Sequence, residues 1–333
     1  MQDILDILYR GKNLHQKQSE MLFHNIIEKK LSAIQVAAAL ISMKVRGETF
    51  EEIIGAVNML LAHSKPFPRP NSLFADITGT GGDNSNTINI STASAIVAST
   101  CGAKIIKHGN CSISSLTGST DLLEKHDVYI ENSAQQALKH FDELGICFLH
   151  APQYYTVLHH IMPIRKQLKT PTLFNIIGPL INPSKPPVTL IGAYKKELLL
   201  PMVQTLKLLK YNRAIVVHCG GIDEVGLHAP THIAELRNDI INNYTLTASD
   251  FGLDSYPLET LCCNSRKQAY EHVINALKGK GQPAHSAVIA ANVALLLTLF
   301  GYDNLRTNVQ LALEKINHGI PYVRLMSLSK SRI

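Results

Sequence analysis

The chain has 333 residues, of which 45% are hydrophobic and 17% are charged, and its formal net charge is +6. This length allows one large domain or two smaller ones. The proportion of hydrophobic to charged residues is typical of a soluble protein with a substantial core. Six cysteines without a C-x-x-C pair match neither a zinc pattern nor a secreted disulfide framework, so we expect a reduced, cytoplasmic protein. The positive charge suits an anionic substrate or nucleic acid and does not choose between them.

Two segments bear on secretion and membrane insertion. The N-terminal segment MQDILDILYRGKNLHQ carries acids among its apolar residues and has no small-residue cleavage site, so we do not interpret it as a secretory signal. The longest apolar run, at residues 287–300, is too short to cross a bilayer comfortably and contains Asn292. We therefore expect a buried helix there and no membrane contact.

The N-terminal part of the chain predicts helices. Ser32 with Gln35 and Thr49 with Glu52 have the spacing of capping boxes, and each pair precedes an apolar-periodic run. Gly47 is placed to end the helix between them. The expected result is a small all-helical domain.

The segment SKPFPRPNS, at residues 64–72, predicts a linker because its three prolines remove backbone donors and restrict the chain. We place a domain boundary here, which gives a helical domain at residues 1–65 and an α/β domain at residues 71–333. We expect a helical segment near residues 160–180 to join the first of these domains.

Beyond the linker, short apolar strands alternate with helices. Expected strands lie at residues 73–78, 103–107, 146–150, 188–194, 213–219 and 231–236. Expected helices lie at residues 91–101, 134–144, 196–209, 285–300 and 303–318, and Gly319 closes the last of them. Residues 236–246, rich in asparagine, predict a turn and a surface hairpin. Strands separated by helices predict βαβ units with a mostly parallel central sheet, which is the α/β class.

A glycine-rich turn, GTGGD at residues 79–83, follows the first expected strand and precedes a helix that starts near Ser91. Glycine lets backbone N–H groups approach a ligand, and a helix N-terminus adds unpaired donors and a positive dipole end. The pattern therefore predicts an anion site, usually for phosphate, with a tight turn at a sheet edge as the alternative. Asn89 and Thr92 add side-chain donors, and Ser91 can also bind a hard cation. Neither the dinucleotide motif nor the P-loop fits, because Asn84 stands where the former needs glycine and no G-K-[ST] follows.

A second polar loop, KHGNCSISSLTGS at residues 107–119, follows the next expected strand. Its Lys107 and its hydroxyl side chains suit a polyanion such as diphosphate, although serine-rich loops are common in other roles. Two such loops after successive strands of one sheet would lie at the same edge, and this strengthens the prediction.

Two further patterns depend on their context. Asp223 and Glu224 follow a buried strand and lie between glycines, and adjacent carboxylates on a loop can bind magnesium, which accompanies phosphate chemistry. An exposed acidic turn is the alternative. Arg165 precedes an apolar segment punctuated by proline and glycine, and it can bind a carboxylate through two hydrogen bonds. A lone arginine is more often a surface charge.

Taken in order, these motifs resemble the signatures of the anthranilate phosphoribosyltransferase family of tryptophan biosynthesis. They stand here as DITGTGGD, NIST, KHGNCSISSLTGS, RKQLKTPTLFNIIGPLINP and DE, and the likeness runs nearly the full length of the chain. The resemblance implies a fold of the nucleoside phosphorylase/phosphoribosyltransferase type. It also implies transfer of the 5-phosphoribosyl group of phosphoribosyl diphosphate to the amine of anthranilate, with release of pyrophosphate.

The resemblance also assigns residues to each ligand. Around phosphoribosyl diphosphate it implies Gly79, Gly82, Asp83, Thr87, Asn89, Ile90, Ser91, Thr92, Lys107, His108, Gly109, Asn110, Cys111, Ser112, Ile113, Ser114, Ser115 and Ser119. It places Gly79, Asn110 and Arg165 on anthranilate. It places Ser91, Asp223 and Glu224 on Mg²⁺, with two ions per subunit, and it implies a homodimer built through the helical domain. The amine of anthranilate is already a nucleophile, so we expect no covalent intermediate and name no general base.

The chain departs from the family pattern at two places. Cys111 replaces the usual arginine of K-H-G-N-R, so one positive charge is missing near the substrates. Tyr155 and Thr156 stand where family members often have the histidine and proline of Y-H-P. These changes can weaken or alter acceptor binding while leaving the diphosphate cradle intact.

Two other functions use the same architecture. The net charge and Cys111 keep open a nucleic-acid-binding relative without transferase activity, which would show steep salt-dependent affinity and no magnesium requirement. Against it, no dense Lys/Arg stripe occurs, and the ligand-type residues remain: Lys107, Asn110, Arg165, Asp223 and Glu224. A nucleoside phosphorylase would carry lysine and serine before T-G-G, where this chain has DITGTGGD. Nucleic acid and nucleosides are therefore the less favoured partners.

Overall fold

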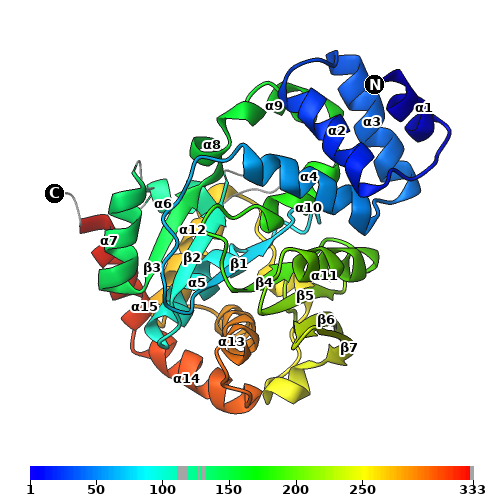
Figure 1. Ribbon diagram of the computed structural model, residues 1–333. Coiled ribbons are helices and arrows are strands. Elements are labelled where there is room, and N and C mark those ends of the chain that lie inside the picture. The colour runs from blue at the N-terminus through cyan, green and yellow to red at the C-terminus, as the bar shows by residue number, and fades with distance from the viewer. Residues whose placement is uncertain (111–118, 126–127, 129–132, 331–333) are drawn as a thin grey trace.

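A seven-stranded sheet forms the frame of the computed structural model, which describes residues 1–110, 119–125, 128 and 133–330 (Figure 1). The strand order is β3-β2-β1-β4-β5-β6-β7. The bounds are β1 Ala75–Gly79, β2 Ile105–Gly109, β3 Ile146–His150, β4 Val188–Gly192, β5 Arg213–Cys219, β6 Thr231–Arg237 and β7 Ile240–Leu246. Strands β3, β2, β1, β4 and β5 are parallel, and β6 and β7 are antiparallel, so the predicted mostly parallel sheet and the hairpin at its end are confirmed.

The register brings the carboxyl ends of the parallel strands to one edge of the sheet. Gly79 at the end of β1 pairs with Gly192 at the end of β4, and Gly109 at the end of β2 pairs with His150 at the end of β3. The loops that follow β1 and β2 therefore leave the sheet at the same edge, where open α/β sheets bind ligands.

Four helices form the N-terminal bundle: α1 Gln2–Tyr9, α2 Gln16–Ile27, α3 Ala33–Arg46 and α4 Phe50–Ala62. Both predicted capping boxes are present, at the N-termini of α3 and α4. A third, at His15 before α2, was not predicted because histidine is an unusual capping residue. Gly47 ends α3 with φ +96°, as its position in the sequence predicted.

The remaining α-helices are α5 Ile90–Thr100, α6 Ser119–Lys125, α7 Ala134–Leu144, α8 Ala151–Tyr154, α9 Met162–Leu168, α10 Leu173–Ile177, α11 Leu199–Leu208, α12 Arg266–Leu277, α13 Pro283–Thr298, α14 Leu305–Asn317 and α15 Ile320–Lys330. Four of these, α6, α8, α12 and α15, were not predicted. At Gly319 the chain turns with φ +67° and continues into α15, because a glycine that ends one helix does not prevent the next.

Helices cover both faces of the sheet, because side chains along each strand alternate between two apolar cores. In β5, Ile215 and Val217 point into one core, and Ala214 and Val216 point into the other. The first core contains α5, α12 and α13, and the second contains the N-terminal bundle and α11. Figure 1 shows the blue bundle at one end of the molecule and α13, α14 and α15 at the opposite end.

The segment near residues 160–180 lies against the N-terminal bundle. The Nε2 atom of His160 hydrogen-bonds to the carbonyl oxygen of Ile26 at 2.8 Å, α9 and α10 contact α3, and α10 also contacts α4. Residues 64–72 form neither helix nor strand. The bundle and the sheet nevertheless share one apolar core, so the domain limits given above stay a prediction.

The long apolar run belongs to α13, which is buried almost throughout. Its polar residue Asn292 accepts from the backbone N–H of Val225 at 3.1 Å and donates to the carbonyl of Val225 at 2.9 Å. A buried amide is tolerated here because both of its functional groups are satisfied. Within the described part of the chain, no helix has both the length and the apolar character needed to cross a membrane.

Candidate active site

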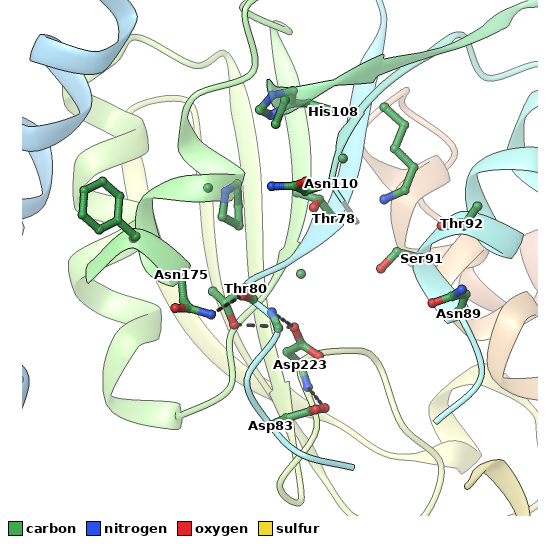
Figure 2. Close-up of a pocket in the computed structure, with 18 of the residues that line it drawn as sticks. Thr78, Thr80, Asp83, Asn89, Ser91, Thr92, His108, Asn110, Asn175 and Asp223 are labelled. Atoms are coloured by element: carbon green, nitrogen blue, oxygen red, sulfur yellow. Dashed lines mark hydrogen bonds between the residues drawn. The ribbon is translucent and has the colours of Figure 1, made fainter. Parts of the chain in front are cut away.

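A cavity of about 290 Å³ opens at the carboxyl edge of the sheet. It is bordered by the loop after β1, the N-terminus of α5, the end of β2, the loop after β5 and the segment that runs from α8 to the turn after α10. Figure 2 shows Asn175 on one side of this cavity and Asn89, Ser91 and Thr92 on the other, with Asp223 beneath. Segments that are distant in the sequence thus build a single site.

The structure brings most of the predicted residues to this cavity. Those that line it are Gly79, Asp83, Thr87, Asn89, Ile90, Ser91, Thr92, Lys107, His108, Gly109, Asn110, Arg165, Asp223 and Glu224. Gly82 does not line it, because its backbone (φ +82°) turns against Pro171, whose Cγ would lie 2.8 Å from an added Cβ. Cys111, Ser112, Ile113, Ser114 and Ser115 lie outside the described residues, and Ser119 is the first residue of α6.

Glycines allow the loop after β5 to approach the loop after β1. A Cβ added to Gly79 would lie 2.3 Å from Oδ2 of Asp223. A Cβ added to Gly192 would lie 1.5 Å from the backbone oxygen of Asp223. The carboxylate of Asp223 in turn accepts from the backbone N–H of Gly81 at 2.6 Å. Close approach, in addition to the turn itself, therefore requires glycine at the ends of β1 and β4.

Carboxylates meet at the floor of the cavity. The backbone N–H of Asp223 donates to Oδ2 of Asp83 at 3.4 Å. The carboxylate of Glu224 accepts from the backbone N–H of Ser91 at 3.1 Å and also from the Ser91 hydroxyl. The sequence motifs indicated that Asp223, Glu224 and Ser91 belong to one metal site. They did not indicate that Asp83 lies beside these residues.

The pKa values of these carboxyl groups are raised. Burial raises the pKa of Asp223 well above its usual range, and the charges of Asp83 and Glu224 raise it further. Burial also raises the pKa of Glu224 to about 7, although the hydrogen bonds from Ser91 and the charge of Lys107 act to lower it. A divalent cation offsets both burial and repulsion, and an all-oxygen donor set is the one that Mg²⁺ prefers. The residues present therefore fit a magnesium site.

Lys107 supplies a buried positive charge next to these groups. Its side chain is 1% exposed and donates to the carbonyl oxygen of Ile77. Burial lowers the pKa of Lys107, whereas nearby carboxylates, Asp76 first, raise it. Asp76 is itself buried, accepts from Asn182 at 2.8 Å and has its pKa raised to about 6 by burial. Asp76 and Asn182 stand in the family motifs DITGTGGD and RKQLKTPTLFNIIGPLINP, but the sequence indicated no role for either, because only the fold shows that Asn182 holds Asp76 near Lys107.

Arg165, from α9, contributes a second positive charge. Its guanidinium lies 5.5 Å from the ring centroid of Phe174 and donates to Oδ1 of Asn175 at 3.4 Å. Burial lowers its pKa to about 10, so it is charged at neutral pH. No carboxylate in the described part of the chain forms an ion pair with it, which leaves it suited to an anionic ligand. Phe174 and Asn175 were not singled out, because only the fold shows that they hold this arginine.

Apolar side chains near Arg165 give the cavity a hydrophobic wall: Pro152, Leu158, Met162, Phe174, Ile177 and Ile181. Tyr155, one of the departures from the family pattern, is buried in this wall and donates its hydroxyl to the carbonyl oxygen of Ile181. Its ring packs edge-on against His108 with 5.8 Å between ring centroids. Burial and the charge of Lys107 lower the pKa of His108 to about 3, so its ring is neutral.

Comparison with known proteins shows the class to which the chain belongs. Residues 2–64 match a family model described as "Glycosyl transferase family, helical bundle domain", and residues 71–322 match "Glycosyl transferase family, a/b domain". The fold and the site thus define the chain as a glycosyltransferase with a helical bundle and an α/β domain.

Individual relatives narrow this class. The chain is 79% identical over 333 residues to the anthranilate phosphoribosyltransferase of Blochmanniella pennsylvanica, covering 100% of this chain and 97% of that protein. The crystal structure of the Thermus thermophilus anthranilate phosphoribosyltransferase superposes with a TM-score of 0.89 at 29% identity, covering 98% of each chain. The Saccharomyces cerevisiae enzyme, solved with PRPP and Mg, gives 0.83 at 27% identity, covering 94% of this chain and 91% of that chain. The chain belongs to the anthranilate phosphoribosyltransferase family.

Proposed function

We propose that this chain transfers the 5-phosphoribosyl group of phosphoribosyl diphosphate to the amine of anthranilate, giving N-(5-phosphoribosyl)anthranilate and pyrophosphate in the second step of tryptophan biosynthesis from chorismate. The observation that carries the proposal is that one cavity contains both an acidic, magnesium-type floor and, beside an apolar wall, the guanidinium of Arg165, which forms no ion pair with the described residues. The first feature suits a diphosphate with its metal ion, and the second suits an aromatic carboxylate.

The diphosphate side of the reaction is supported by the loop after β1 and the N-terminus of α5. Breaking the ribosyl–diphosphate bond builds negative charge on the leaving group, and backbone N–H groups at a helix N-terminus stabilise such charge. Asn89, Ser91 and Thr92 lie at this helix start (Figure 2). Lys107 would neutralise part of the remaining charge, and the hydroxyl groups of the second polar loop would donate hydrogen bonds to the diphosphate.

Magnesium would be held by Ser91, Asp223 and Glu224, with Asp83 adjacent to Asp223. The ion, when bound, neutralises charge on the diphosphate. We propose two ions per subunit, because the acidic groups reach the cavity from both the loop after β1 and the loop after β5. The hydrogen bond from Ser91 orients Glu224 toward α5, and the N–H of Gly81 orients Asp223 toward β1.

Anthranilate would bind with its carboxylate on Arg165 and its ring against the apolar wall. The guanidinium lies over the ring of Phe174 and donates to Asn175, and these two contacts limit where a bidentate carboxylate can lie. Gly79 and Asn110 would contact the acceptor from the strand ends. The amine attacks the sugar directly, so positioning supplies the catalysis and no covalent intermediate or general base is needed.

The setting of the enzyme is also a proposal. The described cysteines, Cys101, Cys147, Cys219, Cys262 and Cys263, are free thiols, which supports a reducing cytoplasm. The bundle exposes large apolar side chains, including Ile34 and Val45 at 81% each, which supports a homodimer formed through the helical domain. We treat residues 1–65, with the segment near 160–180, and residues 71–333 as the two domains. Sedimentation analysis of an Ile34→Lys, Val45→Lys double variant, monomeric where the wild type is dimeric, would support the dimer interface.

The reaction is tested by the loss of anthranilate fluorescence on mixing the protein with phosphoribosyl diphosphate and Mg²⁺, with EDTA as the control. Magnesium-dependent loss supports the proposal and shows that Cys111 and Tyr155 are tolerated. No loss, with phosphoribosyl diphosphate still bound in calorimetry, would place the fault in the acceptor pocket. If anthranilate fluorescence is not lost and phosphoribosyl diphosphate does not bind, the transferase function is refuted.

A further inference from the structure

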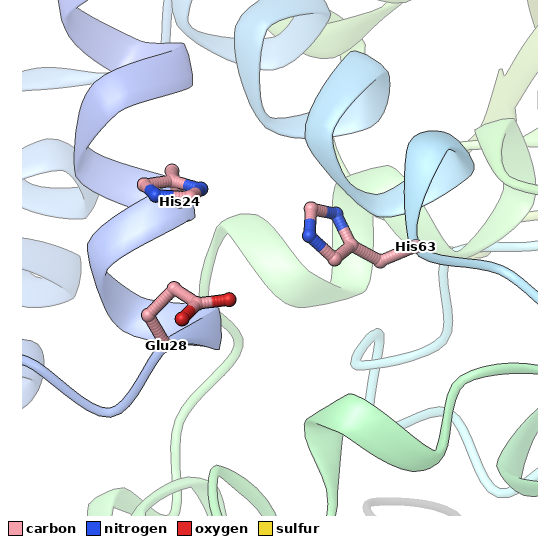
Figure 3. Close-up of side chains that lie close together, drawn as sticks. All are labelled: His24, Glu28 and His63. Atoms are coloured by element: carbon pink, nitrogen blue, oxygen red, sulfur yellow. The ribbon is translucent and has the colours of Figure 1, made fainter.

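A cluster of metal-ligand side chains lies in the helical bundle, outside the cavity. His24 belongs to α2, Glu28 directly follows α2, and His63 directly follows α4. Each presents one ligand atom, and these atoms all lie within 4.8 Å of one another. Figure 3 shows His24 and Glu28 one above the other at the end of α2, with the ring of His63 directed at them across the gap. We propose that these residues bind a divalent transition-metal ion with the chemistry of zinc.

The donor set is the one that zinc prefers. Two imidazole nitrogens and one carboxylate oxygen form common three-residue zinc sites, with water in the fourth position. Bonds of about 2.1 Å in a tetrahedral site place donor atoms about 3.4 Å apart. Rotation of the side chains closes the remaining distance, because Glu28 is exposed and the two histidines are half-buried. No hydrogen bond or ion pair between described residues holds the ring of His24 or the carboxylate of Glu28, so neither loses a partner.

The ring of His63 is already oriented as a metal ligand. Its Nδ1 lies 2.8 Å from the carbonyl oxygen of Met59. A carbonyl only accepts, so Nδ1 carries the proton and Nε2 keeps its lone pair. Histidines that bind metals are commonly fixed in this way, through a carbonyl on the other ring nitrogen.

The location also favours a cation. Helices α2 and α4, of 12 and 13 residues, both end at the cluster. The carboxyl end of a helix carries about half a negative charge, and Glu28 adds a full one. Lys29 and Lys30 follow in exposed positions, where solvent and salt screen their charge.

A bound ion would join the end of α2 to the end of α4, from which the chain enters the linker at residues 64–72. Binding to the folded chain alone raises the temperature of unfolding. We therefore expect zinc to raise the thermal unfolding midpoint of the wild type even when Mg²⁺ is in excess, because Mg²⁺ prefers the oxygen-only site at Asp223 and does not compete for imidazole.

The test is calorimetric titration of the chelator-treated, full-length protein with Zn²⁺ in excess Mg²⁺. Variants His24→Gln and His63→Gln are compared with His318→Gln. His318 is a matched control, since it follows α14 and has Nδ1 2.8 Å from the carbonyl four residues earlier, at Glu314, but belongs to no such cluster among the described residues. Co²⁺ serves as a spectroscopic probe, because imidazole ligation gives a visible absorption band.

We expect one zinc site in the wild type and the His318→Gln control, and a loss of more than about tenfold in affinity in the other two variants, with loss of the Co²⁺ band. Equal zinc affinity in all variants, or no zinc binding by the wild type, would overturn the proposal. Circular dichroism and magnesium-dependent transfer confirm that each variant folds. If a histidine variant does not fold, Glu28→Gln, at an exposed position, replaces it and should weaken zinc binding in the same way.

Discussion

Replacing Asp223 with asparagine should affect catalysis and stability in opposite directions. The buried negative charge of Asp223 supports catalysis but lowers the free energy of unfolding. Burial and the charges of Asp83 and Glu224 raise the pKa of Asp223, so the charged form is unfavourable in the folded protein without metal. Asparagine keeps the shape, still accepts from the N–H of Gly81, and offers an amide donor to its acidic neighbours. We expect the free energy of unfolding in EDTA to stay the same or rise by about 1–2 kcal/mol.

Activity should change in the opposite direction. The amide is a poor ligand for Mg²⁺, and the charge stabilisation that a metal ion gives to a leaving group amounts to several kcal/mol. A loss of about 3 kcal/mol corresponds to about a hundredfold decrease in kcat/KM. The decrease should persist at high Mg²⁺, because the remaining site lacks one of its charges.

The assay combines anthranilate fluorescence over a Mg²⁺ series with urea denaturation in EDTA. Asp254→Asn is the control, since this aspartate is exposed and lies outside the cavity. Wild-type activity of Asp223→Asn at saturating Mg²⁺ would remove Asp223 from the metal site. A marked loss of stability in EDTA would refute the reasoning from buried charge.

Three further substitutions test other parts of the site. Arg165→Gln should raise the KM for anthranilate about 10- to 100-fold, because a charge-assisted hydrogen bond contributes about 1.5–3 kcal/mol, and should leave phosphoribosyl diphosphate binding unchanged in calorimetry. A matching loss of diphosphate affinity would contradict that role. His108 has a pKa lowered to about 3, so below about pH 6.5 the unfolded chain binds a proton that the folded chain does not, and stability falls as pH falls. The penalty at pH 5 is about 2 kcal/mol, and His108→Asn should flatten the pH dependence of urea denaturation by that amount; an unchanged slope would argue against a buried neutral ring. Tyr155→Phe leaves the carbonyl of Ile181 unsatisfied and should lower the free energy of unfolding by about 1–2 kcal/mol, with the KM for anthranilate unchanged. A large change in that KM would show that the hydroxyl contacts the acceptor.

Local features of this protein follow from the sequence because their physics is local. The capping boxes at Ser32 and Thr49 depend on residues three positions apart, and the alternation of strands and helices depends on short apolar patterns. The glycine turn after β1 and the acidic pair after β5 each stand in one loop, and the motif order indicates the family. These elements needed no knowledge of how the sheet is assembled.

Only the tertiary structure decides which of these groups meet. Asp83 and Asp223 are 140 positions apart, and they come together because β1 and β4 are neighbours and their terminal glycines admit the loop after β5. Arg165 acquires a direction only when α10 places Asn175 beside it. His24 and His63 form a cluster only because α2 and α4 end at the same place. Strand order and helix packing depend on the burial of surfaces far apart in the chain, and local sequence patterns do not encode that information.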